Sequence, residues 1–419
     1  MRVSEKMQYA RLLLGQDTHG QPVSVVRCTF SKGTPTSCVL LAEQGYVGVH
    51  CENEEGPPLS LLRARYPGLE EWLGASTVEF LPLSSASSSE SAVGIVVKPY
   101  KELDFRVVGA KLNFHTEAGA SSDIYHSGEV NQYANLQIEP RRAVVLSTLM
   151  QRYVNPMTQF LSLAQGYVLE PFAISGWTEP ARTGRKRAGV VSQVRVLRGD
   201  AAAPCEHGWE AGRLFSVSDL KGRLPERLGR FYSRYSLLKP AYDSYLASLL
   251  LAASPLQRFM DAITAVEAFD RRTGAGTYMG NAQYARVEEV LAKAIPDSVG
   301  SDHAQALRSR IHYGYEFSLR KRMEAIADHW RDVLSYWEHD IPKFASEVAD
   351  TRNYYAHYDR ALEKRAAGPA RLDQLSRFVR MLFECLYLSE MGLEHQDVFE
   401  LVRRVPPEYR RGGSRYSGT

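Results

Sequence analysis

A short segment of the chain combines residue types that together could cleave RNA. Arg352, Asn353 and His357 lie within the run Arg-Asn-Tyr-Tyr-Ala-His. A histidine exchanges protons near neutral pH, an arginine offers a permanently charged fork to phosphate oxygens, and an asparagine can orient an oxygen. No activated serine or cysteine accompanies them in the sequence. The set therefore suits attack by an RNA 2′-hydroxyl, in which His357 moves protons and Arg352 stabilises the phosphorane.

This chemistry specifies the substrate and the products. Cleavage by the 2′-hydroxyl leaves a 2′,3′-cyclic phosphate and a 5′-hydroxyl, and DNA is not cut because it lacks that hydroxyl. We expect no metal ion and no other cofactor in the reaction. RNA is the expected partner.

The helix expected to carry this segment places Arg352 among apolar residues. In a projection of about 100° per residue with Ile341 at zero, Phe344, Val348 and Arg352 all fall within about 60° of zero. An unpaired guanidinium in an apolar stripe costs several kcal/mol. Arg352 therefore requires a carboxylate, a phosphate or a wet interface.

Glu267 occupies a matching position on an earlier predicted helix, which begins at Pro255. With Leu256 at zero, Glu267 falls near 20°, in the middle of that apolar stripe. Two opposite charges so placed are natural partners, and we expect an ion pair between Arg352 and Glu267 in the bundle core or at its mouth. The alternative is that this ion pair has no role in catalysis and only fixes the register of the bundle helices.

His357 does not share a helix face with Arg352. Asn353 and His357 lie one turn apart on one face, whereas Arg352 and His357 diverge by about 140°. The two converge on one substrate only if the helix bends between them or if a second copy of the chain supplies part of the site. The second arrangement predicts a homodimer or a larger homo-oligomer.

The hydrophobic period changes near residue 230, which predicts an α+β protein with three parts. Residues 1–230 form a β-rich N-terminal domain, residues 231–404 an all-α bundle, and residues 405–419 a basic tail. One helix is expected within the β-rich part, around Arg142–Gln165. Expected helices of the bundle are 241–253, 255–272, 284–295, 302–311, 322–337, 342–365 and 372–391.

Composition sets broad limits. With 51 Lys+Arg, 48 Asp+Glu and 44% hydrophobic residues, the chain is too apolar and too balanced in charge to be disordered. No apolar run is long enough to span a bilayer and no export signal is indicated, so we expect a cytoplasmic protein without membrane contact. The five cysteines form no CxxC pair and predict free thiols. Cys205 and His207 lack a second ligand pair, and no metal site is expected.

Basic residues could hold the RNA backbone at two places. One group lies beside Tyr313, Tyr315 and Phe317, whose rings could stack on single-stranded bases. The alternative for each group is a solvated charged face with its aromatic rings turned to the core. The group beside these aromatic residues comprises Arg308, Arg310, His312, Arg320, Lys321 and Arg322, and the second group comprises Arg182 with Arg185–Arg187.

The motif resembles that of a known superfamily. Arg352-Asn-Tyr-Tyr-Ala-His357 is similar to the R-x4-6-H motif of HEPN domains, in the form with asparagine directly after arginine. The upstream helix contains Ala265-Val-Glu-Ala-Phe, and the β-rich half contains Leu161-Ser-Leu-Ala-Gln-Gly-Tyr. Together these segments resemble the ApeA-type HEPN proteins of bacterial anti-phage defence, whose β-rich domain precedes a helical nuclease domain.

The resemblance implies a metal-independent endoribonuclease acting as a dimer or larger oligomer. It assigns Arg352, Asn353 and His357 as catalytic residues and Glu267 as the supporting acid. The enzyme is expected to be restrained until infection is sensed, with a phage-derived trigger and the N-terminal domain as sensor or substrate selector.

Two other functions remain open. One is a non-catalytic HEPN module that binds RNA or protein. The other is a toxin neutralised by nucleotide transfer, for which Tyr355 and Tyr358 are the candidate acceptors.

Overall fold

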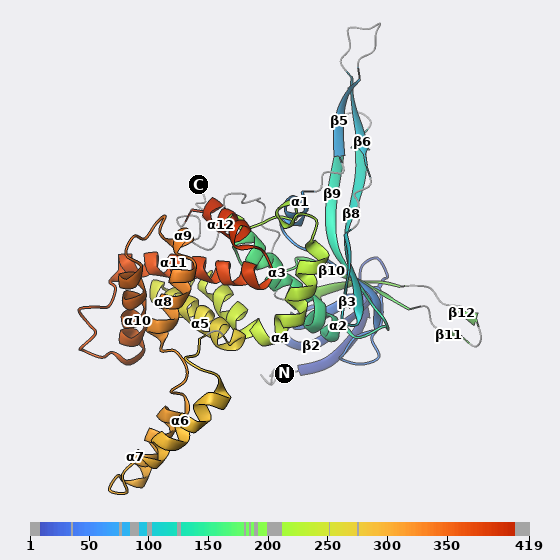
Figure 1. Ribbon diagram of the computed structural model, residues 1–419. Helices are drawn as coiled ribbons and strands as arrows, with labels where there is room; N and C mark the ends of the chain where they lie inside the picture. The colour runs from blue at the N-terminus through green and yellow to red at the C-terminus, as the bar shows by residue number, and fades with distance from the viewer. Residues whose placement is uncertain are drawn as a thin grey trace. The chain divides into compact units, whose positions relative to one another are not determined.

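The computed structural model confirms the predicted α+β fold, with strands in the N-terminal half and helices in the C-terminal half (Figure 1). It divides into two compact units, Met1–Gln165 with Leu169–Ser233 and Gly166–Val168 with Arg234–Thr419. The structure describes residues 9–34, 37–74, 78–83, 92–98, 103–123, 127–179, 182–183, 186–187, 192–198, 212–250, 252–274 and 276–406.

Unit 1 is built on a nine-stranded antiparallel sheet in the order β1-β2-β3-β13-β10-β4-β9-β8-β7. The alternating burial along β4 shows that one face of the sheet is buried. Leu62 and Ala64 are buried on that face, while Arg63 and Arg65 lie on the other. The strands are β1 (Tyr9–Gln16), β2 (Pro22–Thr34), β3 (Ser37–Val47), β4 (Leu59–Arg65), β7 (Leu103–Val107), β8 (Ala110–Asp123), β9 (Ser127–Pro140), β10 (Ala173–Thr178) and β13 (Gln193–Arg198).

Two further strand pairs lie outside this sheet. They are β5 (Val78–Leu83) with β6 (Ala92–Val97), and β11 (Arg182–Thr183) with β12 (Lys186–Arg187). Arg182 and Arg187 of the second predicted basic group belong to the latter pair. Arg185, Cys205 and His207 lie outside the described residues.

Helices pack on the buried face of the sheet. The predicted helix around 142–165 is confirmed as α2 (Leu146–Leu149), a π-helical turn (Met150–Val154) and α3 (Asn155–Gln165). Trp72 of α1 (Leu69–Leu73) makes edge contacts with Phe114 of β8 and Phe160 of α3, at ring-centroid distances of 5.4 and 5.9 Å. These aromatic rings form the centre of the unit 1 core.

Unit 2 is a helical bundle. A 3-10 turn (Ser218–Leu220) precedes α4, and the break between the units falls inside α4 itself. The helices are α4 (Leu224–Ser248), α5 (Pro255–Thr273), α6 (Asn281–Lys293), α7 (Ser301–His312), α8 (Leu319–His329), α9 (Arg331–Leu334), α10 (Ile341–His357), α11 (Pro369–Glu390) and α12 (His395–Arg404). Figure 1 shows α6 and α7 side by side, projecting from the other helices of the unit.

Several predicted helix limits are wrong. Pro240, expected to start a helix, lies inside α4. A proline inside a helix costs about 3 kcal/mol, but Leu238, Ala241 and Tyr242 are buried on both sides of it, and their packing outweighs that cost. The helix expected at 322–337 is broken at the buried Trp330 into α8 and α9, and α12 was not predicted.

The end of α10 is the correction that matters most for the site. The sequence predicted a helix to about residue 365, but Tyr358 adopts φ 50°, ψ 40° and α10 ends at His357. The chain then returns along α10, where the amide of Ala367 donates to the hydroxyl of Thr351 at 2.9 Å. His357 is therefore the last residue of the helix.

The start of α5 provides a test of local stability. The Ser254 hydroxyl accepts a hydrogen bond from the Gln257 amide at 3.1 Å, and Pro255 occupies the first turn, as predicted. Ser254→Ala should lower the stability of α5 by about 1 kcal/mol, because the N-terminus of the helix loses its cap. Hydrogen exchange of α5 amides measures this, with Ser301→Ala, at a position that caps no helix, as the control. Equal protection in both variants would contradict the assignment.

Three cysteines, Cys28, Cys51 and Cys385, are buried and none of them forms a disulfide, as predicted. Burial raises the pKa of the Cys51 thiol, against a hydrogen bond with Ser24. Within the described ranges no group of three or more His, Cys, Asp or Glu side chains could hold a metal ion. No helix among these residues is both long and apolar enough to cross a membrane.

Candidate active site

Helix α10 carries the motif from the bundle core to the surface. Its N-cap Asp340 accepts a hydrogen bond from the Lys343 amide, and Phe344 and Val348 are fully buried. Burial along α10 ends at Thr351, six residues before the end of the helix, so that residues 352–355 are half-buried and His357 is exposed. The predicted apolar stripe is confirmed, and the motif lies where that stripe leaves the core.

Arg352 is held by two neighbours. One of its Nη atoms lies 3.7 Å from Oε2 of Glu267, and the other donates to Oδ1 of Asn353 at 3.2 Å. The predicted ion pair is therefore confirmed. The Arg352 and Glu267 side chains are 32% and 19% exposed, which places the pair at the mouth of the bundle. The guanidinium can thus be reached from solvent while one carboxylate directs it.

The position of Glu267 explains why the pair is not in the core. The residues of α5 that are buried include Phe259, Ala262, Val266 and Phe269, and their mean direction lies near 270° in the projection that places Glu267 near 20°. Glu267 is thus at the edge of the buried face of α5. Sequence periodicity located the stripe of apolar residues but misjudged its centre.

Asn353 and His357 have different surroundings. Asn353 orients Arg352 through its side-chain oxygen, as the hydrogen bond above shows. His357 makes no hydrogen bond or ion pair with any residue that the structure describes. α10 is one continuous α-helix through both Arg352 and His357, and on such a helix the two side chains diverge by about 140°.

Aromatic rings surround the end of α10. Tyr354 contacts Tyr355 and Tyr358 at centroid distances of 5.0 and 5.8 Å, and the Tyr355 hydroxyl donates to the carbonyl of Ala367 at 3.4 Å. Tyr358 is 66% exposed. An exposed aromatic ring offers a stacking surface for a base.

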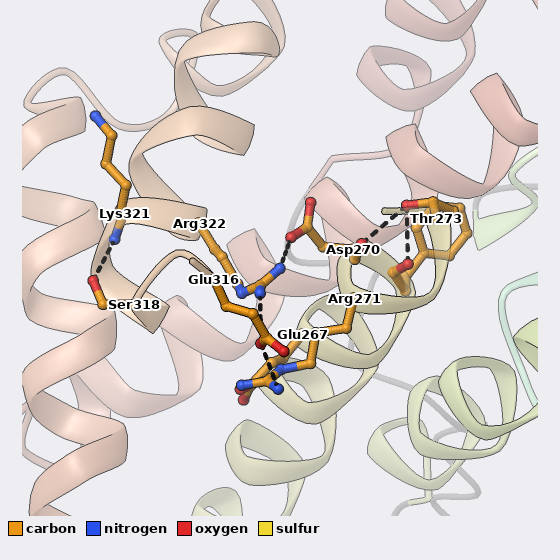
Figure 2. Close-up of polar contacts among 9 residues, drawn as sticks. Glu267, Asp270, Arg271, Thr273, Glu316, Ser318, Lys321 and Arg322 are labelled. Atoms are coloured by element: carbon orange, nitrogen blue, oxygen red, sulfur yellow. Dashed lines mark hydrogen bonds and ion pairs between the residues drawn. The ribbon is translucent and has the colours of Figure 1, made fainter. Parts of the chain in front are cut away.

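The basic residues predicted to bind RNA do not form one surface. Arg322 is 2% exposed and bonds with Asp270 and Glu316, so it is a structural residue that cannot contact RNA. Figure 2 shows Lys321 pointing away from Arg322. Sequence reasoning failed here because adjacent helical residues face different directions.

The other members of that group lie at two separate helix ends. At the end of α7, Arg310 is exposed and the His312 ring contacts a Glu288 carboxylate at 2.9 Å. At the start of α8, Arg320 bonds with Asp350 at 2.7 Å and Lys321 lies 3.7 Å from Glu324. Phe317 packs against Tyr278 and Tyr315 against Tyr284, which leaves Tyr313 as the exposed ring of the three.

Two charged residues beside the site were missed by sequence reasoning. Arg271 bonds with Oε1 of Glu267 at 3.2 Å and with Glu316 at 2.8 Å. The spacing of Glu267 and Arg271, four residues apart on one helix, was a usable signal for the first contact. No local signal pointed to Glu316, which comes from a different part of the chain.

Family comparisons match both halves of the chain. The family described as Apea-like HEPN matches residues 260–397, which include Glu267, Arg352 and His357. The family described as ApeA N-terminal domain 1 matches residues 3–227, more than half of the 419 residues. No curated protein and no solved structure gives a significant match. The chain therefore belongs to the ApeA-type HEPN defence proteins, with an ApeA N-terminal domain 1 followed by an Apea-like HEPN domain.

Proposed function

We propose that this protein is a metal-independent endoribonuclease of anti-phage defence. The observation that carries the proposal is the solvent-accessible Arg352 at the mouth of the HEPN bundle, directed by Glu267 and Asn353, with His357 exposed one turn further along. A fork-shaped cation and an unpartnered imidazole are the groups that transesterification of RNA requires.

In the proposed reaction the 2′-oxygen attacks the adjacent phosphorus and the bond from phosphorus to the 5′-oxygen breaks. His357 of one copy takes the proton of the 2′-hydroxyl and, as an imidazolium, returns a proton to the leaving 5′-oxygen, while Arg352 of the other copy stabilises the charge on the phosphorane oxygens. The products are a 2′,3′-cyclic phosphate and a 5′-hydroxyl.

Two copies also satisfy the helix geometry. Arg352 and His357 diverge by about 140° on a continuous helix, so one copy cannot direct both at the same phosphate. We place the substrate between the HEPN domains of a homodimer or a larger homo-oligomer. Transfer RNA is a candidate substrate, and a phage-derived trigger acting on the N-terminal domain would release the activity.

The activity is tested with the full-length protein and total RNA in EDTA, before and after addition of an extract of phage-infected cells. We expect cleavage with 2′,3′-cyclic phosphate ends, and no cleavage of an RNA whose cut site carries a single 2′-deoxynucleotide. Cleavage of that deoxy-substituted RNA, or cleavage that requires added magnesium, would refute the mechanism.

A non-catalytic RNA- or protein-binding module is the second candidate, because His357 has no partner among the described residues that would orient its ring. A non-catalytic module would retain RNA, and the RNA would be recovered intact even when the trigger is present.

A further inference from the structure

A network of charges connects Arg352 to a separate helical hairpin. The members alternate in sign through the contacts shown in part in Figure 2. In order they are Arg352, Glu267, Arg271, Glu316, Arg322 and Asp270. Of these, only Arg352 contacts the reacting phosphate in the reaction proposed above, and Glu267 directs it.

Glu267 is shared between two arginines. Its Oε2 lies 3.7 Å from Arg352, whereas its Oε1 accepts from Arg271 at 3.2 Å. Each oxygen is thus committed to one guanidinium, and the direction in which Glu267 faces Arg352 depends on the contact with Arg271. A carboxylate held at both oxygens loses the freedom to rotate.

Arg271 is itself held from outside α5. Its Nη1 lies 2.8 Å from Oε2 of Glu316, and the same oxygen lies 3.2 Å from Nη2 of Arg322. Arg322 is buried and also bonds with Asp270. The far end of the network is therefore fixed by a buried ion pair, while Arg271, which is 49% exposed, can be changed without opening the core.

Glu316 belongs to the base of the hairpin formed by α6 and α7. The segment entering the hairpin pairs with the segment leaving it: the Tyr278 amide donates to Tyr315 and the Phe317 amide donates to Gly276. A Cβ atom at Gly276 would collide with the side chains of Arg322 and Asp270. The base of the hairpin therefore lies directly on the buried pair, and this close approach requires glycine.

We propose that Arg271 and Glu316 are positioning residues that hold Glu267, and through it Arg352, in register with the base of the α6–α7 hairpin. The catalytic role of Arg352 rests on the function proposed above, whereas the positioning of its guanidinium does not. The arrangement gives the hairpin a direct route to the active site, because any displacement of the segment carrying Glu316 alters the contact of Arg271 with Glu267.

The positioning is tested without RNA by the NMR signal of the Arg352 Nε–Hε group in 15N-arginine-labelled full-length protein, assigned by its loss in Arg352→Lys. Arg271→Ala should shift this signal and speed its exchange with water, and Glu316→Gln should do so to a smaller extent. Arg272→Ala is the matched control, since Arg272 is adjacent and exposed but bonds with the Leu237 carbonyl outside the network. An unchanged Arg352 signal in Arg271→Ala would overturn the proposal.

A double variant tests the route. In a Glu267→Ala background, adding Arg271→Ala should cause no further change at Arg352, and a further change would show that Arg271 does not act through Glu267. Arg271→Lys, which keeps the charge, should retain part of the wild-type signal.

In the cleavage assay, Arg271→Ala should lower kcat about tenfold and change KM by less than about twofold, because it misplaces a group that acts in the transition state. If the wild-type protein cleaves RNA and Arg271→Ala has the same kcat as the wild type, the proposal fails. If wild type cleaves nothing while the NMR signal responds as expected, the nuclease function fails and the positioning stands.

Discussion

Replacing Arg352 with alanine should lower the rate of RNA cleavage by about a hundredfold or more, because one preorganised donor to a transition-state oxyanion typically contributes that much. The Arg352 side chain is partly exposed and the buried part of α10 ends at the preceding residue, Thr351, so the variant should keep its fold. Initial rates of RNA cleavage in EDTA measure the effect. Arg331→Ala, which removes an exposed arginine of α9, is the control and should cleave like wild type.

His357→Ala should be impaired to a similar degree, and mixing it with Arg352→Ala provides a test of the shared site. Each variant alone lacks one essential group, whereas a mixed dimer contains an intact Arg352 in one copy and an intact His357 in the other. Co-expression of the two variants should therefore restore part of the activity. No recovery in a verified mixed dimer would mean that both groups act within one copy, and full activity of either single variant would remove the catalytic assignment.

Removing Asp270 should be the most destabilising single change in the charge network. Arg322 is 2% exposed, and without Asp270 its one remaining carboxylate partner among the described residues is Glu316, at 3.2 Å. Breaking a buried ion pair by removing one partner costs about 3–5 kcal/mol, because the remaining charge stays buried without full compensation. We expect Asp270→Ala to lower the unfolding free energy of the bundle by about 3 kcal/mol, measured by hydrogen exchange of α5 and α11 amides in denaturant.

Two variants separate charge burial from loss of packing. Adding Arg322→Met to Asp270→Ala should recover most of the stability, because it removes the buried charge while filling a similar volume. Glu289→Ala, which breaks an ion pair with Lys293 that is exposed at both ends, should change the stability of the bundle by less than about 0.5 kcal/mol. A double variant less stable than Asp270→Ala would show that Arg322 stabilises the bundle chiefly by its packing contacts.

Much of the candidate site followed from residue type and helical spacing. The period of 3.6 residues predicted that Arg352 and Glu267 lie on the inward sides of their helices, and their ion pair was found. It also predicted that Asn353 and His357 share a face. Local signals were sufficient for these inferences because side-chain direction on a helix follows from the backbone geometry.

Burial was predicted less well, because it depends on what packs against each face. Arg322 was expected on the surface with Lys321. It is instead enclosed by the closely approaching Gly276 and by the carboxylate of Asp270. Tyr358 ends α10 through a left-handed conformation that its side chain does not favour. Neither outcome has a sequence signal within one or two turns of the residue concerned.

The sequence by itself determined the α+β division, the helix that carries Arg352 to His357, and the opposite charges that would have to meet. Only the tertiary structure decided that this pair lies at the mouth of the bundle and that Glu316, some fifty residues along the chain from Glu267, joins it through Arg271. The reason is that helical periodicity is a property of a few turns, whereas exposure and ion pairing between segments arise when distant parts of the chain pack together.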